Sequence, residues 1–212
     1  MHGEWNRSNL VGNELRNKTL GVIGLGKIGK EVIKRSLSYD MKILGYDPYV
    51  KKDQFSEDEV NIVELDYLVE NSDFITLHLP INDNTRNLFN YDRIKQMKNT
   101  ARIINVARGG IINEVDLARA LNNDIIAGAA IDVFENEPVS QDNKLITAKN
   151  ILLTPHLGAS TIEAKEGVTC SICSQMKDYF LSNKLTNALN IPIADPTLLN
   201  KLSSYYELSE LM

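Results

Sequence analysis

Three glycines, Gly24, Gly26 and Gly29, follow a short apolar run and precede a segment with helical periodicity. In such a strand–turn–helix unit, the first glycine permits a tight turn, the second lets the backbone approach a pyrophosphate, and the third lets helix and strand pack closely. Short apolar runs alternate with amphipathic segments along the chain that follows. This alternation predicts an α/β fold with a doubly wound parallel sheet and helices on both faces.

The apolar runs predict six strands, and the segments between and after them predict five helices. The strands are expected at residues 19–24, 42–46, 73–79, 102–106, 125–131 and 151–154. The helices are expected at residues 28–38, 64–70, 91–98, 114–122 and, as a long last helix, 160–180. Asn90 and Asn113 can each cap a helix start, and Ser160 with Glu163 fits a capping box for the last helix.

Composition excludes several classes of protein. Of the 212 residues, 43% are hydrophobic, and 23 basic against 28 acidic residues give a net charge of −5. Without a basic block, nucleic acid and anionic membranes are not expected as partners. No apolar stretch approaches the ~20 residues that cross a bilayer, and the first residues lack the apolar region of a secretory signal. With only two cysteines, these features predict a cytoplasmic protein.

Asp47 ends the second predicted strand, 18 residues after Gly29. A carboxylate near this spacing accepts hydrogen bonds from ribose hydroxyls and repels a 2′-phosphate. The glycine turn with Asp47 therefore predicts NAD rather than NADP as the cofactor, with the amides near Lys27 and Ile28 facing its phosphates. The alternative is a bare turn in which Asp47 only precedes a proline.

His156 is the candidate acid–base residue among three histidines, because it follows the last predicted strand, at the sheet edge where such folds bind ligands. His2 lies near the terminus, and His78 is expected to be a hydrogen-bonded strand-end residue. Arg108 and Glu137 follow the two preceding strands. Arg108 can bind a carboxylate bidentately, and Glu137 bonded to His156 would favour the imidazolium. The alternative is a loop salt bridge for Arg108 and a merely solvated Glu137.

Four ordered motifs carry a family resemblance. They read Gly-Val-Ile-Gly-Leu-Gly-Lys-Ile-Gly, Asn-Val-Ala-Arg-Gly-Gly-Ile-Ile-Asn-Glu, Ala-Ala-Ile-Asp-Val-Phe-Glu-Asn-Glu-Pro and Thr-Pro-His-Leu-Gly-Ala-Ser-Thr. Over residues 5–190 the chain resembles the D-isomer-specific 2-hydroxyacid dehydrogenases. The resemblance implies a Rossmann NAD-binding domain and hydride transfer between NAD and a small-molecule D-2-hydroxy or 2-oxo acid. The last motif, with the run that starts at Asn187, is most similar to members that act on 3-phosphoglycerate in serine biosynthesis.

The resemblance also implies roles for individual residues. His156 would be the acid–base residue, Glu137 its partner, and Arg108 the cation for the substrate carboxylate. Asp132 would lie near the nicotinamide amide, and Leu79 would contribute its backbone. The full set of implied cofactor contacts is Gly24, Gly26, Lys27, Ile28, Gly29, Asp47, Leu79, Val106, Ala107, Arg108, Asp132, His156, Gly158 and Ala159. No residue cluster has metal-ligand spacing, so no metal is expected.

The same resemblance divides the chain and implies its assembly. We expect an interdomain helix remnant at residues 1–17, the NAD-binding domain at 18–184, and a linker with the start of a substrate or regulatory region at 185–212. These flanks would be partial segments of a substrate domain whose N-terminal part is absent. Family members pair through their cofactor domains, which implies a homodimer.

Three functions stay open on this basis. The chain is a hydride-transfer enzyme or its cofactor-binding portion, a binding module in which NAD controls association, or a catalytically incomplete remnant. Cys170 and Cys173 suggest a redox pair, but they fall on the last predicted helix, where helix packing is the expectation.

Overall fold

All seven strands of the sheet are parallel, as the alternating pattern predicts. The computed structural model describes residues 11–50, 55–56, 59–182, 184–187 and 202. The strands are β1 (Thr19–Ile23), β2 (Lys42–Tyr46), β3 (Asn61–Ile62), β4 (Phe74–Leu77), β5 (Arg102–Asn105), β6 (Gly128–Ile131) and β7 (Ile151–Leu153). The helices are α1 (Lys27–Leu37), α2 (Leu65–Asn71), α3 (Tyr91–Ile94), α4 (Glu114–Asn122) and α5 (Ile162–Ser182), with a 3-10 turn, η3 (Lys144–Thr147).

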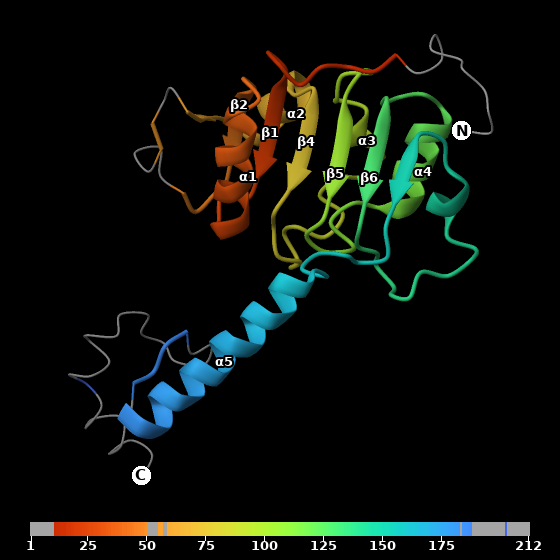
Figure 1. The fold of residues 1–212 in the computed structure, drawn as a ribbon. Coiled ribbons are helices and arrows are strands. Elements are labelled where there is room, and N and C mark those ends of the chain that lie inside the picture. The colour runs from red at the N-terminus through yellow and green to blue at the C-terminus, as the bar shows by residue number, and fades with distance from the viewer. Residues whose placement is uncertain (1–10, 51–54, 57–58, 183, 188–201, 203–212) are drawn as a thin grey trace. The chain divides into compact units, whose positions relative to one another are not determined.

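The strand order is β3-β2-β1-β4-β5-β6-β7 (Figure 1). It confirms the doubly wound parallel sheet, with the order reversing between β1 and β4, the switch point where open α/β sheets bind ligands. All six predicted strands are present. The seventh, β3, was not predicted; it has two residues and pairs only with β2, through Leu44 with Asn61 and Gly45 with Ile62.

One face of the sheet is covered by α2, α3 and α4, which lie behind it in Figure 1. Leu68 of α2, Ile94 of α3 and Leu117 of α4 share a core with Ile75 and Ile103 of the sheet, and all five side chains are fully buried. Burying each such side chain stabilises the fold by about 1.5–3 kcal/mol. This core fixes the strand ends from which the site residues emerge.

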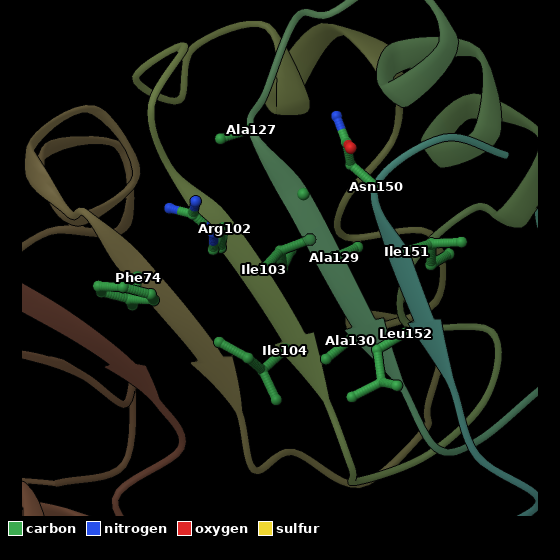
Figure 2. A pocket seen from close by; sticks show the side chains of 11 residues that line it. Phe74, Arg102, Ile103, Ile104, Ala127, Ala129, Ala130, Asn150, Ile151 and Leu152 are labelled. Atoms are coloured by element: carbon green, nitrogen blue, oxygen red, sulfur yellow. The ribbon is translucent and has the colours of Figure 1, made fainter. Parts of the chain in front are cut away.

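The opposite face is only partly covered. There α1 packs over β1 and β2, through Ile33 against Leu20 and Val22. In-register residues of parallel strands point to one face, so Ile104 of β5 and Leu152 of β7 lie on the same side as Val22. Helices therefore lie on both faces, as predicted, but within residues 11–158 as described no helix covers β4–β7 on the α1 side. Figure 2 shows the resulting open hollow, of about 550 Å³.

The chain divides into two units, Met1–Gly158 and Ala159–Met212. The predicted NAD-binding domain, 18–184, includes α5, and this boundary stays a prediction. The described residues of α5 are not buried, and Val168, Ile172, Met176 and Tyr179 recur along it at helical spacing as exposed apolar side chains.

One prediction about α5 is corrected, and a second stays a prediction. Cys170 and Cys173 are both exposed free thiols on this helix, and the helix packing expected for them stays a prediction. The Oγ1 atom of Thr161 accepts a hydrogen bond from the backbone N–H of Ala164 at 3.1 Å. Thr161 therefore takes the capping position predicted for Ser160, because the helix begins at Ile162. The third helical residue is then Ala164 rather than Glu163, so Thr161 caps the helix without the reciprocal glutamate of a capping box.

The flanks are described only in part. Residues 1–10, with His2, lie outside the described residues, and residues 11–17 form no helix, so the expected helix remnant is not seen there. Most of 185–212 also lies outside them. In the part of the chain that the structure describes, no helix is long and apolar enough to span a membrane.

Candidate active site

The glycine turn joins β1 to α1 as predicted. Gly24 has a φ of +96°, which L side chains rarely adopt, and a Cβ there would lie 2.4 Å from the carbonyl oxygen of His78. A Cβ on Gly29 would lie 2.1 Å from the carbonyl oxygen of Gly24. At Gly26, in contrast, a Cβ would meet nothing within 4 Å. Two glycines are therefore required by the turn itself, and the third borders open space.

That open space fits a dinucleotide pyrophosphate. The start of α1 at Gly26 has no side-chain cap, whereas Asn90 and Asn113 cap α3 and α4 as predicted. The first amides of α1 and its positive helix end are thus available to phosphate oxygens. Lys27 is exposed and Ile28 is 65% exposed beside them. The uncapped start of α1, with the exposed Lys27 and Ile28 beside it, therefore fits the phosphates of NAD.

Asp47 lies against the turn, at the end of β2. Its Oδ2 accepts from the backbone N–H of Leu25 and its Oδ1 from that of Tyr49, both at 2.9 Å. A carboxylate has about four lone-pair sites, so both oxygens can still accept from ribose hydroxyls. The carboxylate is therefore placed where the sequence predicted it, and the fixed turn orients it.

The strand end next to the turn carries His78 and Leu79. The Nε2 atom of His78 lies 3.1 Å from Oγ1 of Thr76, and its backbone N–H donates to Ile23. Burial lowers the pKa of His78 below its ordinary value. The prediction of a hydrogen-bonded strand-end histidine is confirmed. Leu79 is half-buried, with its Cδ2 3.2 Å from the position of a Cβ on Gly24.

His156 and Glu137 are paired at the carboxyl edge of the sheet. The Nδ1 atom of His156 lies 2.7 Å from Oε2 of Glu137, and Oε1 of Glu137 accepts from the backbone N–H of Phe134 at 2.9 Å. The hydrogen bond with His156, followed by that from Phe134, lowers the pKa of Glu137. Glu137 is therefore an ionised, oriented partner of the imidazole, rather than a merely solvated carboxylate.

Arg108 lies on the turn after β5, which Asn105 holds together. Asn105 is 2% exposed; its Nδ2 donates to the carbonyl of Arg108 at 2.9 Å and its Oδ1 accepts from Ala107 N–H at 3.1 Å. Arg108 is exposed, and its Nη1 donates to the Ala107 carbonyl at 2.6 Å. A guanidinium has five N–H donors, so the remaining donors do not take part in this bond. The alternative, a loop salt bridge for Arg108, is not seen among the described residues, where Arg86 pairs with Glu135.

The three candidate catalytic side chains share one open pocket of about 280 Å³. Its lining includes Ile81, Arg108, Val133, Phe134, Glu137 and His156. The structure thus brings together a cation, an imidazole and a carboxylate from three strand ends. This is an arrangement that can bind a carboxylate and move a proton.

Asp132 holds the loop that carries His156. It is 5% exposed; its Oδ1 accepts from Thr154 Oγ1 at 2.5 Å and from Leu157 N–H at 2.7 Å, and its Oδ2 accepts from Gly158 N–H at 3.0 Å. Burial alone would raise the pKa of Asp132, but these hydrogen bonds outweigh it and lower that pKa. His156 has a φ of +52°, a strained backbone that these bonds help to maintain.

The remaining implied cofactor residues are placed as follows. Val106, 46% exposed, and Ala107 lie just after β5, beside Arg108. Gly158 donates to Asp132, and Ala159, with a φ of +63°, opens the second unit. Sequence reasoning missed Asn105 and Thr154, although both polar residues follow or end apolar runs. No cluster of three or more potential metal ligands occurs among the residues described.

The chain belongs to the D-isomer specific 2-hydroxyacid dehydrogenases. The family model for their NAD binding domain matches residues 1–158, which hold the sheet, the glycine turn and the His156 pocket. The chain therefore contains the NAD-binding domain of this family, and the expected resemblance is confirmed.

Curated relatives support the narrower resemblance. The chain is 43% identical to a D-3-phosphoglycerate dehydrogenase of Synechocystis over 98% of its length, and 43% identical to one of Methanocaldococcus jannaschii over 99%. It spans 37% and 40% of those relatives, so it corresponds to about two fifths of their length.

Solved structures show the same fold. A formate dehydrogenase of Staphylococcus aureus in complex with NAD is 32% identical, with a TM-score of 0.77 over 87% of this chain and 56% of that one. A D-lactate dehydrogenase of Aquifex aeolicus, complexed with NAD and lactic acid, is 31% identical, with a TM-score of 0.72 over 81% of this chain and 56% of that one.

Proposed function

We propose that the chain is the NAD-binding and acid–base part of an oxidoreductase that transfers a hydride between NAD and a D-2-hydroxy acid. The observation that carries this proposal is the pocket shared by Arg108, Glu137 and His156, at the sheet edge that also bears the glycine turn. An alcohol–ketone interconversion requires a group that moves the hydroxyl proton and a cation for the acid, and both are present.

The chain's residues have distinct tasks in this reaction. When bound, NAD supplies the acceptor or donor of the hydride. The Nε2 atom of His156 accepts the hydroxyl proton as the hydride leaves the carbon, and returns it in the reverse direction. Glu137, bonded to Nδ1, stabilises the resulting imidazolium. Arg108 binds the carboxylate and orients the reacting carbon.

The substrate we propose is 3-phosphoglycerate, with the reaction serving serine biosynthesis. The similarity to D-3-phosphoglycerate dehydrogenases over nearly the whole chain supports this choice. Because the chain spans only part of those relatives, groups outside it would help to close the site and orient the substrate.

Turnover and cofactor binding test the proposal in one sample. The purified 212-residue chain is titrated with NAD, and NADH formation from 3-phosphoglycerate is then followed by absorbance. We expect the unmodified chain to bind NAD, and a His156→Ala variant to lose about 10²–10⁴-fold in any turnover measured at saturating NAD. Equal turnover in the variant would contradict the role of His156. NAD binding without turnover in the unmodified chain would instead support the catalytically incomplete alternative.

We propose further that the chain forms a homodimer. The face of β4–β7 that no helix within the described part of residues 11–158 covers supports this, because parallel sheets are normally covered on both faces and Leu152 there is 63% exposed. Sedimentation of the unmodified chain is compared with that of Leu152→Asp and, as a control, Val115→Asp on α4, a residue 62% exposed. We expect only Leu152→Asp to weaken the dimer. A monomeric unmodified chain would contradict the proposal.

We also propose that the protein works in the cytoplasm. Its two exposed, unpaired cysteines suit a reducing compartment. Fluorescence microscopy of the tagged chain in its own cells tests this location, and export of the tagged chain would contradict it.

A further inference from the structure

The loop between β6 and η3 carries Glu137. The outer part of this loop is not held in place by burial in the core. Val133 and Phe134 are buried, but residues 135–138 are exposed. Glu137 nevertheless has to stay within hydrogen-bond distance of His156, which follows a different strand. The exposed stretch therefore needs partners outside itself.

One carboxylate supplies such partners, at the first residue of the stretch and at Asn143, where the loop ends before η3. The Oε1 atom of Glu114 accepts from the backbone N–H of Glu135 at 2.7 Å, and its Oε2 accepts from Nδ2 of Asn143 at 2.6 Å. Glu137 lies between these two attachment points. Hydrogen bonds to an ionised acceptor are roughly twice as strong as neutral ones, so this carboxylate is an effective anchor.

Glu114 is itself fixed to the core. It is the first residue of α4, whose N-cap Asn113 accepts from the backbone N–H of Asp116 at 3.0 Å. The same helix buries Leu117 and Leu121 completely. The loop is thus tied through one side chain to a helix that packs against the sheet.

The loop also contacts the turn that carries Arg108. A Cβ on Gly109 would lie 1.9 Å from the carbonyl oxygen of Phe134, so the two backbones touch. A shift of the loop would therefore disturb both the cation and the acid–base pair. Glu114 is not among the residues that line the pocket, so it would act on the chemistry only through this loop.

We propose that Glu114 is a positioning residue, whose carboxylate clasps the loop at Glu135 and Asn143 and thereby holds Glu137 against His156. The catalytic meaning of this clasp rests on the function proposed above. The clasp itself is a property of this chain that can be measured without turnover.

The test follows the Glu137 carboxyl by ¹³C NMR titration in the full 212-residue chain. Glu114→Ala removes the clasp, and Asp116→Ala is the matched control, since it removes the same charge from the same helical turn. The Asp116 carboxylate bonds to Tyr91 N–H at 3.0 Å, not to the loop. A His156→Gln variant gives the pKa of Glu137 without the imidazole.

We expect Glu114→Ala to raise the pKa of Glu137 by at least half of the change seen in His156→Gln, and Asp116→Ala to leave that pKa where it is. An unchanged pKa in Glu114→Ala, or an equal rise in Asp116→Ala, would overturn the proposal. If Glu114→Ala does not fold, Glu114→Gln serves instead. It keeps one oxygen acceptor and turns an amide toward Asn143, so an intermediate rise is expected, and no rise overturns the clasp.

An NAD titration of the same samples separates this inference from the proposed function. Glu114→Ala should still bind NAD, because the glycine turn lies on β1 and α1 and does not depend on this loop. If the unmodified chain fails to bind NAD, the proposed function fails, and the carboxyl titration still decides whether the clasp exists.

Discussion

The Nδ1 atom of His156 lies 2.7 Å from Oε2 of Glu137, although 19 residues separate them and each follows a different strand. The pair exists because the carboxyl ends of parallel strands lie at one edge of the sheet. The loop with His156 and the loop with Glu137 are each held there by a different carboxylate. Asp132 holds the His156 loop through backbone amides, and Glu114 holds the Glu137 loop. The geometry of the pair thus depends on carboxylates that do not belong to it.

Asp132→Asn should destabilise the fold. The amide nitrogen of asparagine cannot accept a hydrogen bond, so at least one of the three donors, Thr154, Leu157 or Gly158, loses its bond to this buried side chain. Such a loss costs about 1–3 kcal/mol in the free energy of unfolding, which urea denaturation measures. The exposed Asp83→Asn change is the control and should stay within about 0.5 kcal/mol. Equal unfolding midpoints for the two variants would contradict this account of Asp132.

Asp47→Asn should relax the preference for NAD over NADP. The variant keeps an oxygen that can accept from Leu25 N–H, but it loses the charge that repels a 2′-phosphate. We expect the ratio of the two dissociation constants to shift toward NADP by about tenfold, or ~1.4 kcal/mol. Calorimetric titration with each dinucleotide measures the ratio. Asp40→Asn, on the turn before β2, is the control, and an unchanged ratio in Asp47→Asn would count against Asp47 as the selectivity residue.

Asp73 should make stability depend on pH in the acid range. Its Oδ2 accepts from Thr19 N–H at 2.8 Å and its Oδ1 from Lys98 Nζ at 2.9 Å. Burial alone would raise the pKa of Asp73, but these bonds lower it below 3.8. A carboxyl whose pKa is lower in the folded state stabilises the fold above the unfolded pKa, and this contribution is lost as pH falls through the folded pKa.

The free energy of unfolding of the unmodified chain should therefore exceed that of Asp73→Asn at pH 7, and the difference should shrink below about pH 4. Urea denaturation at pH 7, 4 and 3 measures it. A difference that stays constant or grows on acidification would show that Asp73 does not contribute in this way.

Much of the fold was predictable from sequence because buried parallel strands appear as continuous apolar runs, such as Ile103 with Ile104 in β5. The strand β3 was not predictable in this way, since two residues at a sheet edge carry no pattern. Likewise, alternation of runs does not say which face each helix covers, so only the three-dimensional structure shows that α2, α3 and α4 share one face and α1 lies on the other.

The site was predictable where side chains follow strands, as Arg108, Glu137 and His156 do. The hydrogen bonds of Asp132 were not, because they depend on the left-handed backbone of His156, which turns two later amides toward the carboxylate. The clasp of Glu114 joins residues 21 and 29 positions apart, through a loop without regular structure. Such contacts follow from tertiary structure and leave no local pattern.

The most direct measurement for the whole account is a calorimetric NAD titration of the unmodified chain, Gly26→Val and Gly12→Val. Neither glycine has an atom within 4 Å of an added Cβ, so both variants should fold, but only Gly26 borders the space assigned to the pyrophosphate. We predict that the unmodified chain and Gly12→Val bind NAD equally and that Gly26→Val loses at least tenfold in affinity. Equal binding by all three, or no binding by the unmodified chain, would contradict the assignment of the glycine turn as the cofactor site.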